Sequence, residues 1–402
     1  MPRAADYTIK GFLYQFNKSI LEILKSSDES TITVEGIVED VEVATPSLTR
    51  AIQCKYHEAG GPFAPSSIFR PLLQMMHHFH SNADANIHYI LFAHFQSVDT
   101  NAAGSIGRPD LEDALNSKNV DLQKLTEQLR GKVDLEGFLT RFTLEFGPAF
   151  NELVTEVCGA LKANGIPEGD IDTLAYPNAI YIVARLSVKH DPAERSTTKP
   201  KFLKELKEIR KTAISRWTLA LRTRKQLLEA RRAQLKTHLD KNARLRHLVI
   251  DSKSLDDYSA EIVLFVRDYL DKYHFKPAHI YTPVFCLCTS LDDLNDVEYR
   301  LYEKGIICAT GLIGGRFEAP HLFREPLYGK EVGGLLKREF SIRLLRWEDH
   351  GPELNVQKCE DLYIIGEPDC DSLDTGDVNV ERLAASSLKE IKYLMGVSNV
   401  YE

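Results

Sequence analysis

The first hundred residues carry hydrophobic side chains in alternating helical and strand-like patterns. Residues 9–25 place large apolar side chains at steps of three and four, which predicts an amphipathic helix. Residues 31–43 are β-branched and alternating, and residues 50–57 form a second such run, so we expect two strands. A helical pattern over 66–80 precedes a continuous apolar run over 87–95, which predicts a strand buried on both faces. This order predicts a compact α/β module.

The rest of the chain divides into a helical stretch and a second α/β region. A polar, glycine-containing break at 101–107 follows the first module, and helical spacing dominates up to about residue 250. From about residue 256, helices and short apolar strands alternate again. We therefore expect an N-terminal α/β domain over 1–105, a helical region with basic helices over 106–255, and a C-terminal α/β domain for regulation or assembly over 256–402.

Composition narrows the class of protein. The 402 residues are 43% hydrophobic, which is too apolar for a disordered chain and sufficient for two or three cores. We expect no membrane span, because no run of about 18 apolar residues occurs. The seven cysteines lack paired C-x-x-C spacing, which argues against a structural zinc site or a disulfide scaffold. With no signal-peptide pattern at the first residues, these features predict a cytoplasmic protein.

Charge is concentrated in one segment. Between Lys199 and Arg246, sixteen Lys and Arg residues face four acidic residues, a local charge of +12 in a chain of net charge −8. Two interpretations stay open. The segment is either a basic face that is solvated or paired with acidic groups, or a surface that binds the phosphates of DNA. On the second interpretation, Arg231, Arg232 and Lys236 contact DNA.

Candidate chemistry lies on the two N-terminal strands. Gln53 and Lys55 are two residues apart and therefore lie on one face of a strand. Asp40 ends the apolar row of the preceding strand, where a carboxylate is costly without a compensating cation. Oxygen atoms of Asp40 and Gln53 suit Mg²⁺ or Mn²⁺, which polarises a phosphate. Lys55 can position water or stabilise charge on phosphorus, so the pattern predicts phosphodiester cleavage.

Three short motifs resemble a known superfamily of nucleases. They are Gly11-x-x-Tyr14-Gln15, Glu35-x-x-x-Glu39-Asp40 and Gln53-x-Lys55. Their order over about residues 8–95 resembles the restriction-endonuclease-like (PD-(D/E)xK) superfamily, and its Mrr-like branch in particular, where Q-x-K replaces E-x-K. Within that branch, the chain is similar to effector nucleases of bacterial anti-phage systems. The resemblance implies an N-terminal restriction-endonuclease-like mixed sheet flanked by helices.

The resemblance also assigns roles to individual residues. It places Asp40, Gln53 and Lys55 in the catalytic site, with Gln15 joining them from the first helix. Asp40 and Gln53 are then the metal ligands. Strand alternation puts Glu35 and Glu39 on the face opposite Asp40, so the role of these two residues stays open.

The function implied is a Mg²⁺- or Mn²⁺-dependent endonuclease that cuts double-stranded DNA in anti-phage defence. By the same resemblance, we expect a homo-oligomer assembled with a HerA-type hexameric ATPase. One alternative is a nuclease gated directly by a cyclic oligonucleotide bound in the C-terminal domain. The absence of a recognisable duplicated ligand-binding half after residue 256 favours the ATPase-coupled form. The other alternative is a non-catalytic interaction protein with a vestigial nuclease fold.

Overall fold

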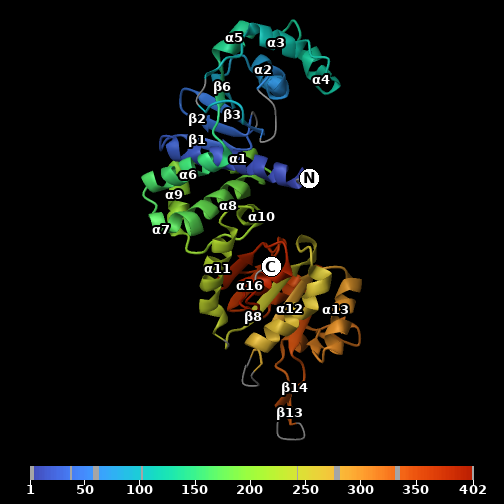
Figure 1. The fold of residues 1–402 in the computed structure, drawn as a ribbon. Coiled ribbons are helices and arrows are strands. Elements are labelled where there is room, and N and C mark those ends of the chain that lie inside the picture. Colours follow the sequence, from blue (N-terminus) through green and yellow to red (C-terminus); the bar gives the residue numbers. More distant parts are fainter. Residues whose placement is uncertain are drawn as a thin grey trace. The chain divides into compact units, whose positions relative to one another are not determined.

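The chain forms two compact units, residues 1–210 and residues 211–402, each built around its own β-sheet (Figure 1). The structure is a computed structural model. It describes residues 4–36, 39–57, 63–100, 103–241, 243–275, 281–330 and 336–400. None of the described helices is long and apolar enough to cross a membrane.

A seven-stranded sheet with the order β5-β6-β4-β3-β2-β1-β7 is the centre of the first unit. Its strands are β1 (Thr31–Val34), β2 (Val41–Ala44), β3 (Thr49–His57), β4 (Ile87–Phe95), β5 (Ala103–Gly104), β6 (Phe142–Phe146) and β7 (Ser196–Thr197). Strands β1, β2 and β3 pair antiparallel, whereas β3, β4 and β6 pair parallel. The sheet is therefore mixed, as the sequence predicts.

Helices cover both faces of this sheet. The helices of the first unit are α1 (Ala4–Lys25), α2 (Phe69–Ser81), α3 (Arg108–Leu115), α4 (Val120–Leu129), α5 (Leu135–Thr140), α6 (Phe150–Ala163), α7 (Glu168–Asp170), α8 (Tyr176–Ser187) and α9 (Lys199–Glu208). Short 3-10 turns, η1 (Pro65–Ile68) and η3 (Pro192–Arg195), and a π-helix, η2 (Ile171–Ala175), connect some of them. Alternate residues of β4 point to opposite faces. Leu91 packs in the core with α2 to α5, whereas Phe92 contacts Tyr14 of α1.

The second unit contains a six-stranded sheet whose neighbouring strands all pair parallel, in the order β10-β15-β9-β8-β16-β17. The strands are β8 (Arg246–Asp251), β9 (Val284–Cys288), β10 (Cys308–Ala309), β15 (Ile342–Arg346), β16 (Asp361–Ile365) and β17 (Asn379–Leu383). Two small hairpins join β11 (Leu312–Ile313) to β12 (Arg316–Phe317) and β13 (Tyr328–Lys330) to β14 (Leu336–Arg338).

The helices of the second unit pack around this parallel sheet (Figure 1). They are α10 (Arg216–Leu219), α11 (Arg224–Leu239), α12 (Tyr258–Tyr273), α13 (Leu291–Glu303), α14 (Ala319–Phe323), α15 (Trp347–His350) and α16 (Leu388–Leu394), with 3-10 turns η4 (Ser252–Ser254) and η5 (Gly351–Asn355). Leu228 and Leu235 of α11 and Phe265 of α12 belong to one buried cluster. The basic segment thus begins in the first unit and ends inside the core of the second.

The α/β class is confirmed, but three details of the sequence interpretation differ from the structure. The expected strand over 31–43 is a hairpin of β1 and β2. Strands β6 and β7, within the expected helical region, join the first sheet. The observed boundary lies at residue 210 rather than near 105 and 255, because α3 to α5 bury apolar side chains against α2 and β4. The restriction-endonuclease-like assignment stays a prediction.

Candidate catalytic site

The structure brings Asp40 and Gln53 together at the edge where β2 begins. Asp40 directly precedes β2, and the register that pairs Val41 with Ile52 places it beside Gln53 on β3. Asp40 Oδ2 accepts a hydrogen bond from the backbone amide of Cys54 at 2.8 Å. Gln53 Nε2 lies 3.4 Å from Asp40 Oδ1. One carboxylate oxygen is therefore firmly held, whereas the other has only a long contact.

Lys55 lies on the same face of β3 as Gln53 and interacts electrostatically with Asp40. The pKa of Asp40 is raised to about 6, mainly by burial and to a smaller extent by the nearby charge of Glu35. The Cys54 amide, Lys55 and Gln53 act in the opposite direction because each stabilises the ionised form. Asp40 is therefore mostly ionised at neutral pH.

Glu39 is a second buried carboxyl group beside Asp40. Its side chain is 8% exposed. Burial and the charge of Asp40 raise the pKa of Glu39 to about 8, partly offset by Lys55. Two adjacent carboxyl groups that are both removed from water resist simultaneous ionisation, and a divalent cation would relieve that cost.

The residues present fit a divalent cation at Asp40 and Gln53. Gln53 Oε1 is buried and has no hydrogen-bond partner among the described residues. Amide and carboxylate oxygens are ligands that Mg²⁺ and Mn²⁺ prefer, and the side chains of Gln53 and Asp40, which are in contact, supply one of each kind. Within the described ranges, no group of three or more His, Cys, Asp or Glu side chains is arranged to hold a metal. The candidate cation site therefore depends on one carboxylate, that of Asp40, and one amide oxygen, that of Gln53.

Gln15 reaches the site through Glu35 rather than directly. Gln15 is 7% exposed on α1, and its Nε2 donates to Glu35 Oε1 at 2.7 Å. Glu35 follows the end of β1 and has a φ of +50°, so the chain turns there. The expectation that alternation places Glu35 opposite Asp40 is therefore wrong, because Glu35 does not lie within a strand. Sequence reasoning left this residue unassigned.

The three residues expected to contact DNA lie on α11 of the second unit. Arg231 is 3% exposed and forms an ion pair with Glu381, so its guanidinium is not available to a phosphate, and that assignment needs correction. Arg232 donates to the Ser398 carbonyl at 3.0 Å and to Asn399 Oδ1 at 2.7 Å. Lys236 is exposed. Two of the three cations thus bind groups of their own unit.

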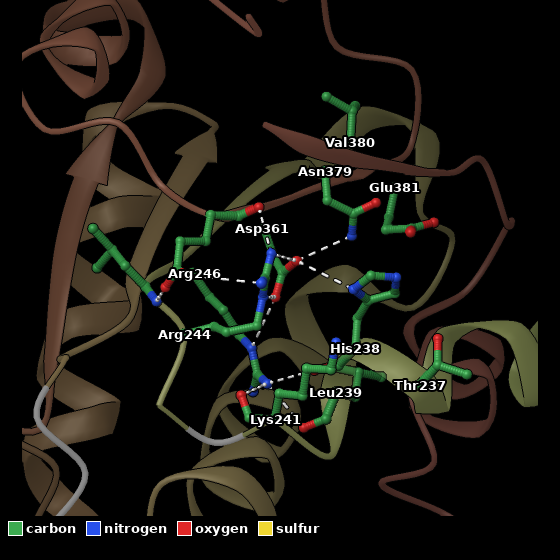
Figure 2. Close-up of polar contacts among 12 residues, drawn as sticks. Thr237, His238, Leu239, Lys241, Arg244, Arg246, Asp361, Asn379, Val380 and Glu381 are labelled. Atoms are coloured by element: carbon green, nitrogen blue, oxygen red, sulfur yellow. Dashed lines mark hydrogen bonds and ion pairs between the residues drawn. The ribbon is translucent and has the colours of Figure 1, made fainter. Parts of the chain in front are cut away.

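Arginines at the end of the basic segment also have internal partners. Figure 2 shows Arg244 directed at the fully buried Asp361, with hydrogen bonds of 2.8 and 2.9 Å. Burial opposes ionisation of Asp361, but bonds from Arg244 and Asn379 hold its pKa below the usual range. Arg246 donates to the carbonyls of His238 and Leu239 at the end of α11 and to the carbonyl of Lys241 just after it. Internal pairing therefore accounts for part of the local charge.

The comparisons with known proteins give a weak structural likeness. No protein-family model matches the chain, and no curated protein matches it. The Cap4 SAVED/CARF-domain receptor of Acinetobacter baumannii with the cyclic trinucleotide 3'3'3'-cAAA is 13% identical, with a TM-score of 0.28 over 92% of this chain and 95% of that chain. With 2'3'3'-cAAA, the values are 12%, 0.31, 96% and 92%. Scores this low do not establish a shared fold.

Proposed function

We propose that the first unit is a nuclease that hydrolyses phosphodiester bonds of double-stranded DNA with Mg²⁺ or Mn²⁺. The observation that carries this proposal is the buried oxygen of Gln53, which has no hydrogen-bond partner among the described residues, on the side chain whose nitrogen lies 3.4 Å from the Asp40 carboxylate. Lys55 on the same strand face adds the cation that phosphate chemistry requires. The order of α1, three antiparallel strands, α2 and the parallel strand β4 supports the resemblance to restriction-endonuclease-like proteins.

Each residue of this site has a distinct task in the proposed reaction. Asp40 and Gln53 hold the cation, and a bound Mg²⁺ would polarise the phosphate and acidify water. Lys55 donates to a non-bridging phosphate oxygen or orients the attacking water. The positive charge of Lys55 stabilises the ionised form of Asp40, which favours a carboxylate at this site near neutral pH.

Plasmid cleavage tests this proposal. The wild type with Mg²⁺, either alone or together with an activating cyclic oligonucleotide, should convert supercoiled plasmid into nicked and linear forms. Lys55→Ala should lower the rate about 100-fold or more, because one stabilising donor is lost. Lys25→Ala is the matched control, since this lysine is exposed at the end of α1. A folded wild type that never cuts, whether alone, with the product of a neighbouring gene or with any of the cyclic oligonucleotides, would support the interaction protein with a vestigial nuclease fold.

The second unit provides a candidate site for a regulatory nucleotide. A hollow of about 450 Å³ lies between the second half of α12, residues 304–307 and β14. Four of its side chains are cationic, against one carboxylate: Arg267, Lys304, Lys337, Arg338 and Asp271. Phe275, with 59% of its surface exposed, adds an aromatic ring at the rim. Cations with an aromatic ring suit a ligand that carries phosphates and a base.

We therefore propose gating by a cyclic oligonucleotide as the form of regulation to test first. The Cap4 receptors named above are described with cyclic trinucleotides, which makes such molecules suitable probes. The HerA-type ATPase and the homo-oligomer rest on the sequence resemblance alone and stay predictions. A panel of cyclic di- and trinucleotides should include one that switches on plasmid cleavage. Lys304→Ala should weaken that response, whereas Lys253→Ala, which lies at a different hollow, should not.

A further inference from the structure

Glu35, directly after β1, has a backbone conformation that residues other than glycine rarely adopt. Its φ of +50° lies in the left-handed region, where a side chain crowds its own backbone. The turn closes on the candidate site, because the Glu35 amide donates to the Asp40 carbonyl at 2.8 Å and the Gly36 amide donates to the Glu39 carbonyl at 3.0 Å. Strained residues of this kind gather at functional sites and need surrounding groups to hold them.

An arginine 160 positions later in the chain holds this turn. Arg195 Nη1 donates to the Glu35 carbonyl at 2.8 Å. Its Nε donates to the Lys189 carbonyl at 2.7 Å, and its Nη2 to the His190 carbonyl at 3.5 Å. Strand β7 begins directly after Arg195 and pairs with β1. This pairing places Arg195 beside the end of β1. The planar guanidinium presents these donors in a fixed geometry that a lysine ammonium lacks.

The carboxylate of Glu35 is held from a second direction. Gln15 Nε2 donates to Glu35 Oε1 at 2.7 Å, and in the described part of the chain no other side chain hydrogen-bonds to this carboxylate. Glu35 is also close enough to Asp40 for its charge to act on that residue. Arg195 holds the backbone of Glu35, and Gln15 holds one of its carboxylate oxygens. The second oxygen accepts no side-chain hydrogen bond among the described residues and is therefore available to a cation.

We propose that Glu35 is a second carboxylate of the metal site and that Arg195 is its positioning residue. Gln15 orients the carboxylate, Arg195 holds the strained backbone that carries it, and Asp40 and Gln53 provide the other oxygen ligands. This inference rests on the proposed nuclease function only for the reaction that the metal serves. The cation binding that it predicts is measurable without DNA.

Binding of Mn²⁺ to the metal-free, full-length protein, followed by electron paramagnetic resonance, tests the inference. Arg195→Ala should weaken Mn²⁺ binding about 10–100-fold, as expected when the support of a metal ligand is removed. The Mg²⁺ concentration for half-maximal plasmid cleavage should rise by a similar factor. Arg185→Ala is the matched control, because this exposed arginine of α8 pairs with Glu205 at 2.6 Å, and both quantities should stay at the wild-type values.

A double-mutant cycle separates positioning from a general effect on folding. Glu35→Gly keeps the positive φ without strain and removes the side chain that carries the carboxylate, so it should weaken Mn²⁺ binding as Arg195→Ala does. If Arg195 acts through Glu35, adding Arg195→Ala to Glu35→Gly should weaken binding no further. An equal loss in both backgrounds overturns the positioning role. If Arg195→Ala does not fold, Arg195→Lys takes its place in the cycle.

The outcomes distinguish this inference from the proposed function. Wild-type Mn²⁺ affinity in Glu35→Gly, or no Mn²⁺ binding by the wild type, overturns the inference. If the wild type cuts DNA but Glu35→Gly and Arg195→Ala keep full Mn²⁺ affinity, the nuclease function is supported and the inference about Glu35 and Arg195 is refuted. A wild type that binds Mn²⁺ with the expected responses but never cuts DNA, with or without the cyclic oligonucleotides, refutes the nuclease function and supports the metal site.

Discussion

At the scale of single residues, the candidate site contains two adjacent carboxyl groups that are largely removed from water. Asp40 and Glu39 are adjacent in the chain, and burial raises the pKa of each, to about 6 and about 8. Such groups gather at functional sites more often than elsewhere, because desolvation is costly and must serve a purpose. Both pKa values lie near physiological pH, so ionisation of these two groups should change metal binding and stability within a pH range that experiments can cover.

Cation binding should depend on pH through Asp40. The carboxylate must be ionised to hold a metal, and its pKa is about 6. Lowering the pH from 7.5 to 5 should therefore raise the Mg²⁺ concentration for half-maximal cleavage about tenfold, as protons compete for the site. Magnesium titrations of plasmid cleavage at several pH values measure this. A requirement for Mg²⁺ that stays constant over this range would contradict the assignment of Asp40 as a ligand.

Stability should depend on pH through Glu39. The pKa of Glu39 rises from 4.5 to about 8 on folding, so the folded protein holds this proton more tightly than the unfolded chain. The contribution of Glu39 to the free energy of unfolding is fully present below pH 4.5. It decreases as the pH rises towards 8, by up to about 1.4 kcal/mol per pH unit. Glu39→Gln removes the ionisation, so relative to the wild type it should be more stable at pH 8.5 than at pH 5.

Urea unfolding of the metal-free protein at these two pH values measures the difference. Glu29→Gln, at an exposed position after α1, is the matched control and should keep the wild-type pH dependence. If Glu39→Gln also follows the wild-type curve, Glu39 ionises freely in the folded protein and does not contribute to a buried carboxyl pair.

Part of this residue-level picture follows from the sequence. The two-residue spacing of Gln53 and Lys55 places them on one strand face, and Asp40 lies beside Gln53. The orientation of Glu35 could not be predicted, because strand alternation fails where the chain turns. Arg195 could not be predicted either, since its hydrogen bond to Glu35 depends on the tertiary pairing of β7 with β1.

At the scale of elements, one signal for the β1–β2 hairpin was present in the sequence. Gly36 interrupts the β-branched run, and a glycine inside a strand pattern often marks a turn or bulge. A Cβ atom at Gly36 would lie 2.1 Å from Glu42 Oε1, so the Glu42 side chain would have to move to accommodate any other residue there. Ile37 and Val38, the next residues of the expected strand, lie outside the described residues. The apolar character of this run favoured one long strand.

Helix α11 illustrates a case in which charge alone left two interpretations open. Glu381 is 1% exposed on β17, and a buried carboxylate of this kind needs a cation beside it. Arg231 and Lys211 provide that cation, although a sequence pattern does not reveal a partner 150 residues away. The basic residues that face the sheet therefore serve the core of the second unit, whereas those on the opposite side stay open to solvent.

Removing the Arg231 side chain should therefore affect folding rather than DNA binding. Arg231→Ala should destabilise the protein by about 2–4 kcal/mol, because Glu381 stays buried with only Lys211 to compensate it. The exposed Lys236→Ala is the matched control and should change stability by less than about 0.5 kcal/mol. Denaturant unfolding gives both values. An Arg231→Ala variant of wild-type stability with a weaker salt dependence of DNA binding would restore the phosphate-contact interpretation.

At the scale of the whole molecule, the central sheets of the two units are of different kinds. The first is mixed, with the candidate catalytic residues on β3 and before β2, and the second is parallel throughout. The second unit also contains the basic hollow, which is lined by residues of α12 and of the separate hairpin strand β14. Sequence patterns predicted both α/β regions because each contains a strand, β4 or β16, that is a nearly continuous run of buried residues. The boundary at residue 210 was not predictable, since β6 and β7 join the first sheet from far along the chain.

The account depends on the claim that oxygen atoms of Asp40 and Gln53 hold the metal with which the protein cuts DNA. Cleavage of supercoiled plasmid by Gln53→Glu and Gln53→Ala, at one Mg²⁺ concentration, tests it most directly. Gln53→Glu should keep cleaving, because a carboxylate oxygen replaces the amide oxygen as a hard ligand, and Gln53→Ala should lose at least about 100-fold. Cleavage by Gln53→Ala at the wild-type rate would contradict the account.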